Sequence, residues 1–158
     1  MAPSFTEVVL WLFVVNHGIA FGAGLYETRM IVSPWLGLVL RGEDARLPDS
    51  GLKFWAFVTT VPLTLLTIAS LVAAWQTPGP RGVWWLGAAV ITLVERVMTF
   101  TYFIPTMLKL QCAQVSPESK VKTVATRWAN LNYVRSGLSL AAWIAALRAF
   151  SLLSEASG

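Results

Sequence analysis

Charged residues are scarce in this sequence and are absent from long stretches of it. Only 13% of the 158 residues are Asp, Glu, Lys or Arg, whereas 56% are hydrophobic. A soluble domain carries roughly twice that share of charge. Four apolar segments, each long enough for a helix to cross a bilayer, occupy most of the chain. The composition therefore excludes a soluble catalytic domain and predicts an integral membrane protein.

Cysteine and histidine each occur once, as Cys112 and His17. One cysteine excludes an intrachain disulfide and a thiolate metal cluster. One histidine excludes bis-histidine haem, and the Glu-x-x-His pairs of a carboxylate-bridged di-iron site are missing. No glycine-rich phosphate loop or dinucleotide fingerprint is present. We therefore predict no metal and no cofactor, with haem on His17 alone as the formal alternative.

The apolar segments predict a single all-α domain over residues 1–158, a four-helix transmembrane bundle. The expected helices are 5–32, 52–75, 83–104 and 117–153, and the last begins outside the hydrocarbon. Ser33-Pro34 should end the first helix, because the residue before a proline disfavours helical backbone. Met1 to Glu7 carries no Lys or Arg, so we expect a retained helix rather than a cleaved signal.

Lys and Arg are concentrated in the first and third connecting segments. These carry Arg29, Arg41, Arg46, Lys53, Lys109, Lys120, Lys122 and Arg127, whereas the opposite side carries only Arg81 and Arg148. The positive-inside rule places these two segments in the cytoplasm and both termini on the non-cytoplasmic side. The net charge of +4 thus reflects membrane orientation and does not indicate nucleic-acid binding. Trp75, Trp84 and Trp85 flank the remaining turn and are expected to form an interfacial belt.

Polar side chains interrupt three of the predicted helices at a similar depth. Charges inside a membrane are expensive and usually face a protein interior or a wet cavity. Helical spacing groups these residues into three stripes: Asn16, Ala20, Ala23 and Glu27; Glu95, Thr99 and Tyr102; Trp128, Asn132, Arg135 and Ser139. The sequence predicts that the stripes face one another around a polar pocket nearer the cytoplasmic side.

Such a pocket has the groups for proton abstraction. His17 or Glu95 would take a proton from a weakly acidic C–H or phenol, and Arg135 with Asn132 would hold the resulting oxyanion. The pocket around the substrate would be lined by Glu27, Arg96, Tyr102 and Trp128.

Each of these residues also has a structural interpretation. Glu95 can pair with Arg96 or Arg135 to hold the bundle together, and His17 can hydrogen-bond a neighbouring carbonyl. Arg135 and Glu27 can reach the interface, and Asn132 can bridge helices.

Three patches of sequence resemble the anthrone oxygenase-like family of small four-helix membrane proteins. They are Tyr26-Glu27-Thr28 with Pro34-Trp35, Tyr102-Phe103-Ile104-Pro105-Thr106, and Arg127–Ser136, which contains Trp128 and the Asn132-x-x-Arg135 motif. The resemblance implies the four-helix fold and oxidation of an anthrone to an anthraquinone by O₂ without an evident cofactor. Thr106 and Tyr133 stand where the family has Asn and often has His, and the second change removes a candidate base.

The leading hypothesis is a membrane enzyme that oxidises a hydrophobic phenolic or quinonoid molecule with O₂ as co-substrate. The first alternative is a non-catalytic lipid-binding or assembly subunit. The second is a small transporter or channel component, which would need an oligomer. Gly18 and Gly22 form a small-xxx-small pattern that allows close helix approach, either inside the bundle or between two copies of the chain.

Overall fold

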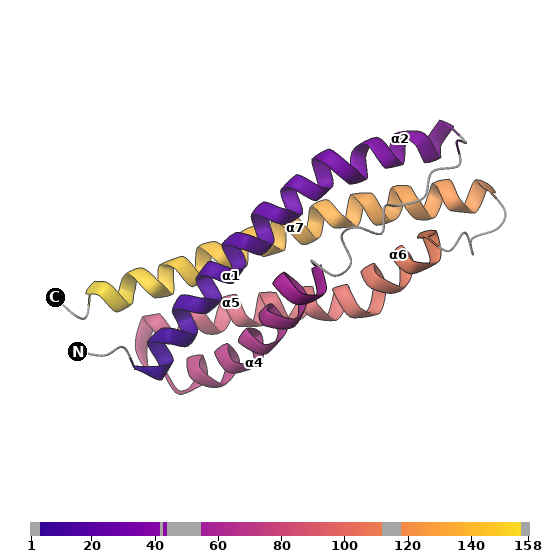
Figure 1. Cartoon of the computed structure of the whole chain (residues 1–158). Helices are drawn as coiled ribbons and strands as arrows, with labels where there is room; N and C mark the ends of the chain where they lie inside the picture. Colours follow the sequence, from indigo (N-terminus) through magenta and orange to yellow (C-terminus); the bar gives the residue numbers. More distant parts are fainter. Residues whose placement is uncertain (1–3, 42, 44–54, 112–117, 156–158) are drawn as a thin grey trace.

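The computed structural model describes residues 4–41, 43, 55–111 and 118–155, and this part of the chain is almost entirely helical, without a strand. Four helices are long and apolar enough to cross a membrane: Phe5–Arg41, Trp55–Trp75, Gly79–Leu110 and Lys120–Leu153. The beginning of the first span and the end of the fourth lie at one end of an elongated bundle (Figure 1). We call that end the terminal half and the opposite end the loop half. The predicted fold class, an all-α transmembrane bundle, is confirmed.

Three of the four spans contain a π-helical segment. The first span consists of α1 (Phe5–Glu27), η1 (Thr28–Val32) and α2 (Ser33–Arg41). The second consists of η3 (Trp55–Thr60) and α4 (Val61–Trp75). The third consists of α5 (Gly79–Met98), η4 (Thr99–Phe103) and α6 (Ile104–Gln111). The fourth is the single helix α7 (Glu118–Glu155).

Each π-helical segment ends two residues before a proline, namely Pro34, Pro62 and Pro105. A proline inside a helix lacks an N–H and its ring clashes with the carbonyl four residues earlier, and a wide π turn relieves both problems. The prediction that Ser33-Pro34 ends the first helix is therefore wrong, because the helix continues to Arg41. The third helix likewise continues past Pro105 and starts at Gly79 rather than Val83.

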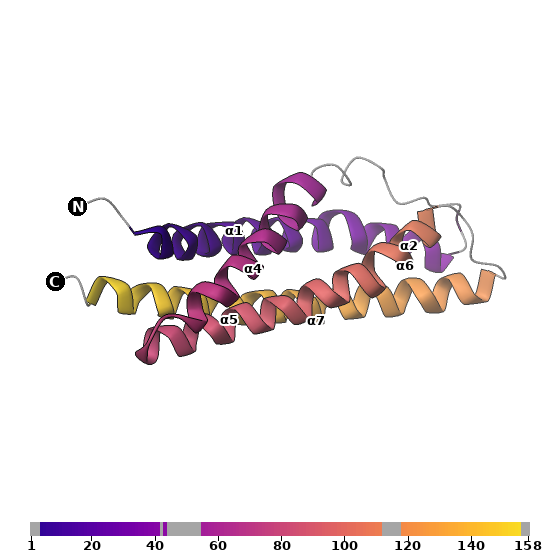
Figure 2. The same ribbon diagram turned by 90° about the horizontal axis from the view of Figure 1, so that it is seen from below.

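The helices pack as a ring in which α1 and α5 each contact both α4 and α7, an arrangement that can be followed in Figures 1 and 2. Since α7 has 38 residues, it is about 57 Å long and exceeds a hydrocarbon core of about 30 Å.

Gly18 packs closely against α7, because a Cβ there would be 3.1 Å from the Trp143 ring. Gly22 has open space around the same position.

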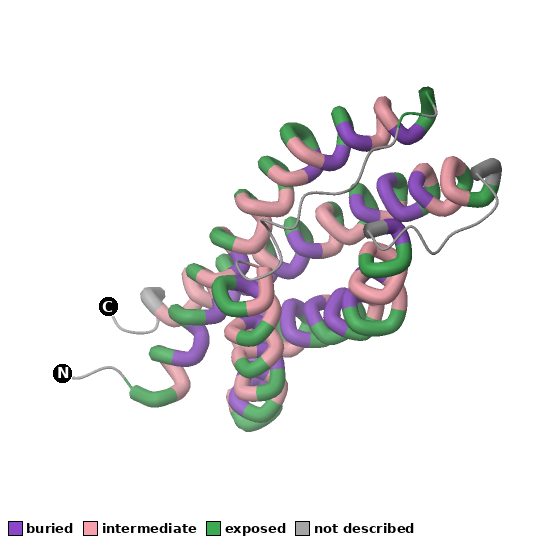
Figure 3. Tube along the Cα trace, turned by 45° about the vertical axis from the view of Figure 1, so that its right-hand side comes forward, coloured by how far each residue is buried: buried purple, intermediate pink, exposed green. Residues whose placement is uncertain are grey.

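Two hydrophobic clusters fill the bundle. The cluster in the terminal half is built around Phe13, Leu63 and Trp85, and the cluster in the loop half around Trp35, Phe103 and Trp128. Outward faces are exposed (Figure 3) and carry many large apolar side chains, as expected for contact with lipid. Trp85 is fully buried, so its predicted place in an interfacial belt is wrong, although Trp75 and Trp84 are exposed.

The turn between α4 and α5 requires a glycine at position 82. A Cβ on Gly82 would collide with the carbonyl oxygen of Thr77. We expect Gly82→Ala to destabilise the protein by about 1–3 kcal/mol, as other overpacking substitutions do. Thermal unfolding in detergent measures the effect. Gly87→Ala is the matched control, because nothing lies within 4 Å of a Cβ there and alanine favours a helix; equal unfolding midpoints for the two variants would contradict the expectation.

Candidate functional site

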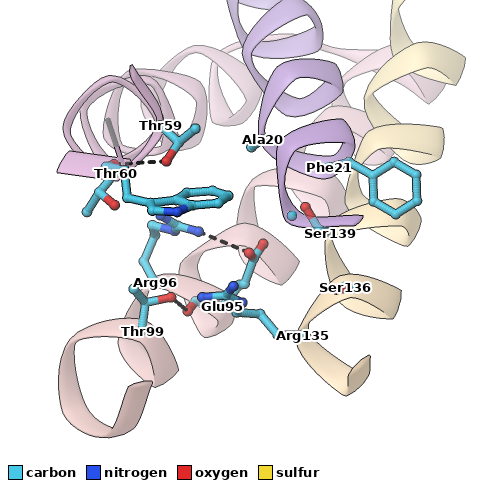
Figure 4. A pocket seen from close by; sticks show the side chains of 12 residues that line it. Ala20, Phe21, Thr59, Thr60, Glu95, Arg96, Thr99, Arg135, Ser136 and Ser139 are labelled. Atoms are coloured by element: carbon cyan, nitrogen blue, oxygen red, sulfur yellow. Dashed lines mark hydrogen bonds and ion pairs between the residues drawn. The ribbon is translucent and has the colours of Figure 1, made fainter. Parts of the chain in front are cut away.

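A polar cavity of about 40 Å³ lies between the four spans, at the level that separates the two hydrophobic clusters. Every span contributes to its lining, which Figure 4 shows from close by. The lining residues are Ala20, Phe21 and Gly24 of α1, Trp55, Thr59 and Thr60 of η3, Glu95, Arg96 and Thr99 of α5 and η4, and Arg135, Ser136 and Ser139 of α7. The predicted internal polar pocket therefore has a counterpart in the structure.

Glu95 and Arg96 form an ion pair inside this cavity. Arg96 Nη2 donates to Glu95 Oε1 over 3.0 Å, and both side chains are less than a tenth exposed. The second carboxylate oxygen, Oε2, and the Arg96 Nε have no hydrogen-bond partner among the described residues. Leaving a buried polar atom unpaired is costly, so Oε2 is a candidate contact for a water molecule or a ligand.

Arg135 enters the cavity from α7 without a direct carboxylate partner. No Asp or Glu oxygen of the described residues lies within 4.0 Å of its guanidinium. Its position is instead fixed by the Phe103 ring, whose centroid is 4.7 Å from the guanidinium carbon. Such cation–π contacts orient an arginine but do not use its N–H donors. Those donors therefore remain available to a group in the cavity.

Three of the five hydroxyl groups in the lining donate their hydrogen to a backbone carbonyl of their own helix. Thr59 donates to the Trp55 carbonyl over 2.9 Å, Thr99 to the Glu95 carbonyl over 2.8 Å, and Ser136 to the Asn132 carbonyl over 2.9 Å. A hydroxyl has a single hydrogen to donate but two lone pairs. These oxygens can thus only accept further hydrogen bonds, and the strong donors of the cavity are its two arginines.

His17 does not line the cavity. It is fully buried one helical turn farther toward the terminal half, where its Nδ1 is 3.0 Å from the Phe13 carbonyl and its Nε2 is 3.0 Å from Thr92 Oγ1. A carbonyl can only accept, so Nδ1 carries a proton and donates it. His17 therefore links α1 to α5 across the bundle.

Four more of the predicted site residues lie outside the cavity lining. Asn132 is fully buried and donates through Nδ2 to Thr28 Oγ1 over 2.8 Å, while its Oδ1 has no partner among the described residues. Trp128 donates to the Phe103 carbonyl over 3.3 Å, and Tyr102 packs into the loop-half cluster. Glu27 lies beside the Trp55 side chain.

The structure thus brings together Glu95, Arg96 and Arg135 and adds a wall that the sequence did not predict. Trp55, Thr59 and Thr60 come from the second span, which has no charged residue between Trp55 and Trp75. The only signal for them was the pair of threonines before Pro62. Within the part of the chain that the structure describes, no three His, Cys, Asp or Glu residues are placed to hold a metal ion.

Comparison with known proteins gives one match. A family model described as anthrone oxygenase matches residues 54–145, which is more than half of the chain. The matched range includes the cavity residues of η3, α5, η4 and α7 and leaves out α1. No curated protein and no solved structure matches the chain.

Proposed function

This chain belongs to the anthrone oxygenase family, and we propose that it is a membrane oxygenase of a hydrophobic phenolic or quinonoid substrate. Dioxygen is the co-substrate and no cofactor is required. The observation that carries the proposal is the cavity itself, which is lined by both Glu95 and Arg135; among the described residues, Glu95 Oε2 has no hydrogen-bond partner and the Arg135 guanidinium has no carboxylate partner. A base and an oxyanion-stabilising cation are the two groups that such a reaction needs.

The proposed reaction converts a ring CH₂ and O₂ into a ring C=O and water. Glu95 takes one proton from the CH₂, and the electron pair delocalises onto a ring oxygen that Arg135 holds. The carbanion adds O₂, and the peroxide formed receives the proton back from Glu95. Loss of the second C–H proton to Glu95 expels hydroxide as the O–O bond breaks, and Glu95 returns that proton to complete the water molecule. No external reductant is needed.

The cavity favours Glu95 over His17 as the base. Glu95 lines the cavity and its Oε2 has no hydrogen-bond partner among the described residues, whereas both ring nitrogens of His17 have partners outside the cavity. Asn132 lies outside the lining, where its side chain donates to Thr28 Oγ1.

The test is a turnover assay with the purified protein in detergent. Anthrone is supplied, and O₂ uptake and anthraquinone absorbance are followed together against the uncatalysed oxidation. One O₂ consumed per quinone formed, at a rate proportional to protein, is the expected result. A rate equal to that in buffer, for anthrone and for hydroxylated anthrones, would remove the oxygenase proposal. An absorbance spectrum before the assay also shows whether haem is bound.

We propose further that the loop half lies in the cytoplasm and that both termini lie on the non-cytoplasmic side. The support is the concentration of Lys and Arg in the first and third connecting segments. An epitope tag after Gly158 should then be reached by antibody in intact cells, whereas a tag inserted in the third connecting segment should be reached only after permeabilisation. The reverse pattern would invert the topology.

A further inference from the structure

The cavity is too small for the whole substrate that the proposed function requires. Its volume is about 40 Å³, and a water molecule needs roughly 10–15 Å³ on this scale. The space therefore holds about three water-sized groups and cannot enclose fused aromatic rings. A polar head group fits inside it, while the ring system attached to that group has to lie at its edge.

The charges of the lining select the kind of head group. The cavity contains two guanidinium groups and one carboxylate, and Glu95 Oε1 is already paired with Arg96. Arg135 is left with N–H donors and no carboxylate within 4.0 Å among the described residues. Thr59, Thr99 and Ser136 present only lone pairs. A group that gives up a proton and becomes a single oxyanion complements this set of partners.

We infer that the cavity is a subsite for the hydroxyl group of a phenol, which binds as the phenolate with its oxygen against Arg135. The O–H proton passes to water outside the cavity, so the bond that breaks and the bond that forms are both O–H bonds, no oxidant takes part, and Glu95 keeps its carboxylate for the C–H proton. The inference rests on the proposed function for the ring system of the natural ligand, but the binding step does not depend on turnover.

Trp55 determines which rings can be attached to that head group. It is the bulkiest side chain of the lining, lies at the start of η3, and its indole lies beside Glu27 of α1. The adjacent Thr59 and Thr60 complete the same wall. The indole offers the largest aromatic surface of the lining to a ring bonded to the phenolate carbon, which makes Trp55 the specificity-determining residue of this proposal.

The first experiment uses 4-nitrophenol, whose ionised form alone is yellow. Binding to the purified protein is measured without O₂, at a pH at which the free probe is mostly neutral. We expect the bound probe to show the phenolate band. Arg135→Gln should weaken binding at least tenfold and remove the band, whereas Arg127→Gln, an exposed position on the same helix, should behave as the unaltered protein. A probe that binds as the neutral phenol, or that does not bind, would overturn the inference and indicate a cavity that holds water only.

The second experiment varies the ring. Phenols of one, two and three fused rings are compared for the unaltered protein, Trp55→Phe and Trp55→Ala. Removing the indole should improve the affinity for the three-ring phenol at least fivefold relative to the one-ring phenol, and Trp55→Phe should give a smaller change in the same direction. If Trp55→Ala does not elute as a folded species, Trp55→Phe alone carries the comparison. Equal changes for all three phenols would exclude a role in specificity.

The two proposals fail in different ways. If phenolate binding depends on Arg135 but no O₂ uptake occurs under any condition, the subsite proposal stands and the oxygenase proposal is wrong. If anthrone is turned over but no Arg135-dependent phenolate band is seen, the oxygenase proposal stands and the subsite proposal is wrong.

Discussion

Replacing Glu95 by glutamine is expected to reduce anthrone turnover by about 10²–10⁴-fold, the usual contribution of a general base, while the bundle stays folded. Glutamine keeps the shape of the side chain and a carbonyl oxygen that can accept from Arg96 in place of the present 3.0 Å ion pair, but it cannot take a proton at neutral pH. Turnover number and unfolding midpoint are measured on the same preparation. Glu7→Gln, a substitution near the membrane surface in the first turn of α1, is the control and should leave turnover unchanged.

The same variant separates catalysis from a purely structural role of the charges. If Glu95 and Arg96 only hold the bundle together, neutralising both in Glu95→Gln/Arg96→Gln should restore most of what either single change costs, because the whole ion pair is removed and neither charge is left without its partner. The proposed mechanism predicts the opposite, with turnover of the double variant at or below that of Glu95→Gln. A double variant that recovers stability and activity together would favour the non-catalytic subunit.

Replacing His17 by alanine is expected to produce the largest loss of stability among the polar residues of the bundle. The change removes two hydrogen bonds of 3.0 Å, one to the Phe13 carbonyl and one to Thr92 of the facing helix, and leaves a cavity where a fully buried ring was. Each lost hydrogen bond costs about 0.5–1.5 kcal/mol, and the cavity adds to this.

The measurement for His17 combines thermal unfolding with a pH–rate profile. A double-mutant cycle of His17→Ala with Thr92→Val should show coupling between the two positions of about 0.5–3 kcal/mol. Because His17 is a positioning residue in this structure, the variant that remains folded should show a lower turnover number with an unchanged shape of the pH–rate profile. Loss of one limb of the profile at unchanged stability would reassign the base from Glu95 to His17.

The fold was predictable because it follows from composition, whereas the site was predictable only in part. Charges buried in a membrane usually face a protein interior, and this reasoning grouped Glu95, Arg96 and Arg135, which the structure places in one cavity lining. Their roles stay a prediction. On the third span, the α-helical spacing used for the predicted stripe holds up to Thr99 and fails beyond it. Tyr102 lies within the π-helical segment η4, so it is turned out of the cavity toward Phe103, with which its ring makes an edge contact.

The second span shows a different limit of sequence reasoning. Thr59 and Thr60 are neutral and common in membrane helices, where a hydroxyl can bond to its own backbone, so nothing in their identity indicates a site. Their place in the lining follows from how α4 packs between α1 and α5. The charged residues that mark α5 and α7 are absent from the second span. Only tertiary packing reveals the contribution of Trp55.

The π-helical segments also bear on how relatives of this chain should be aligned. A π turn accommodates one residue more than an α turn, so a relative with regular helices would be one residue shorter at Thr28–Val32, Trp55–Thr60 or Thr99–Phe103. An alignment without a gap would pair either Glu95 or Arg135 with its counterpart, but not both. Every position on the far side of the π turn would be shifted by one residue. Single-residue gaps placed within these three segments are therefore expected to bring Trp35 and Phe103 into register with their counterparts.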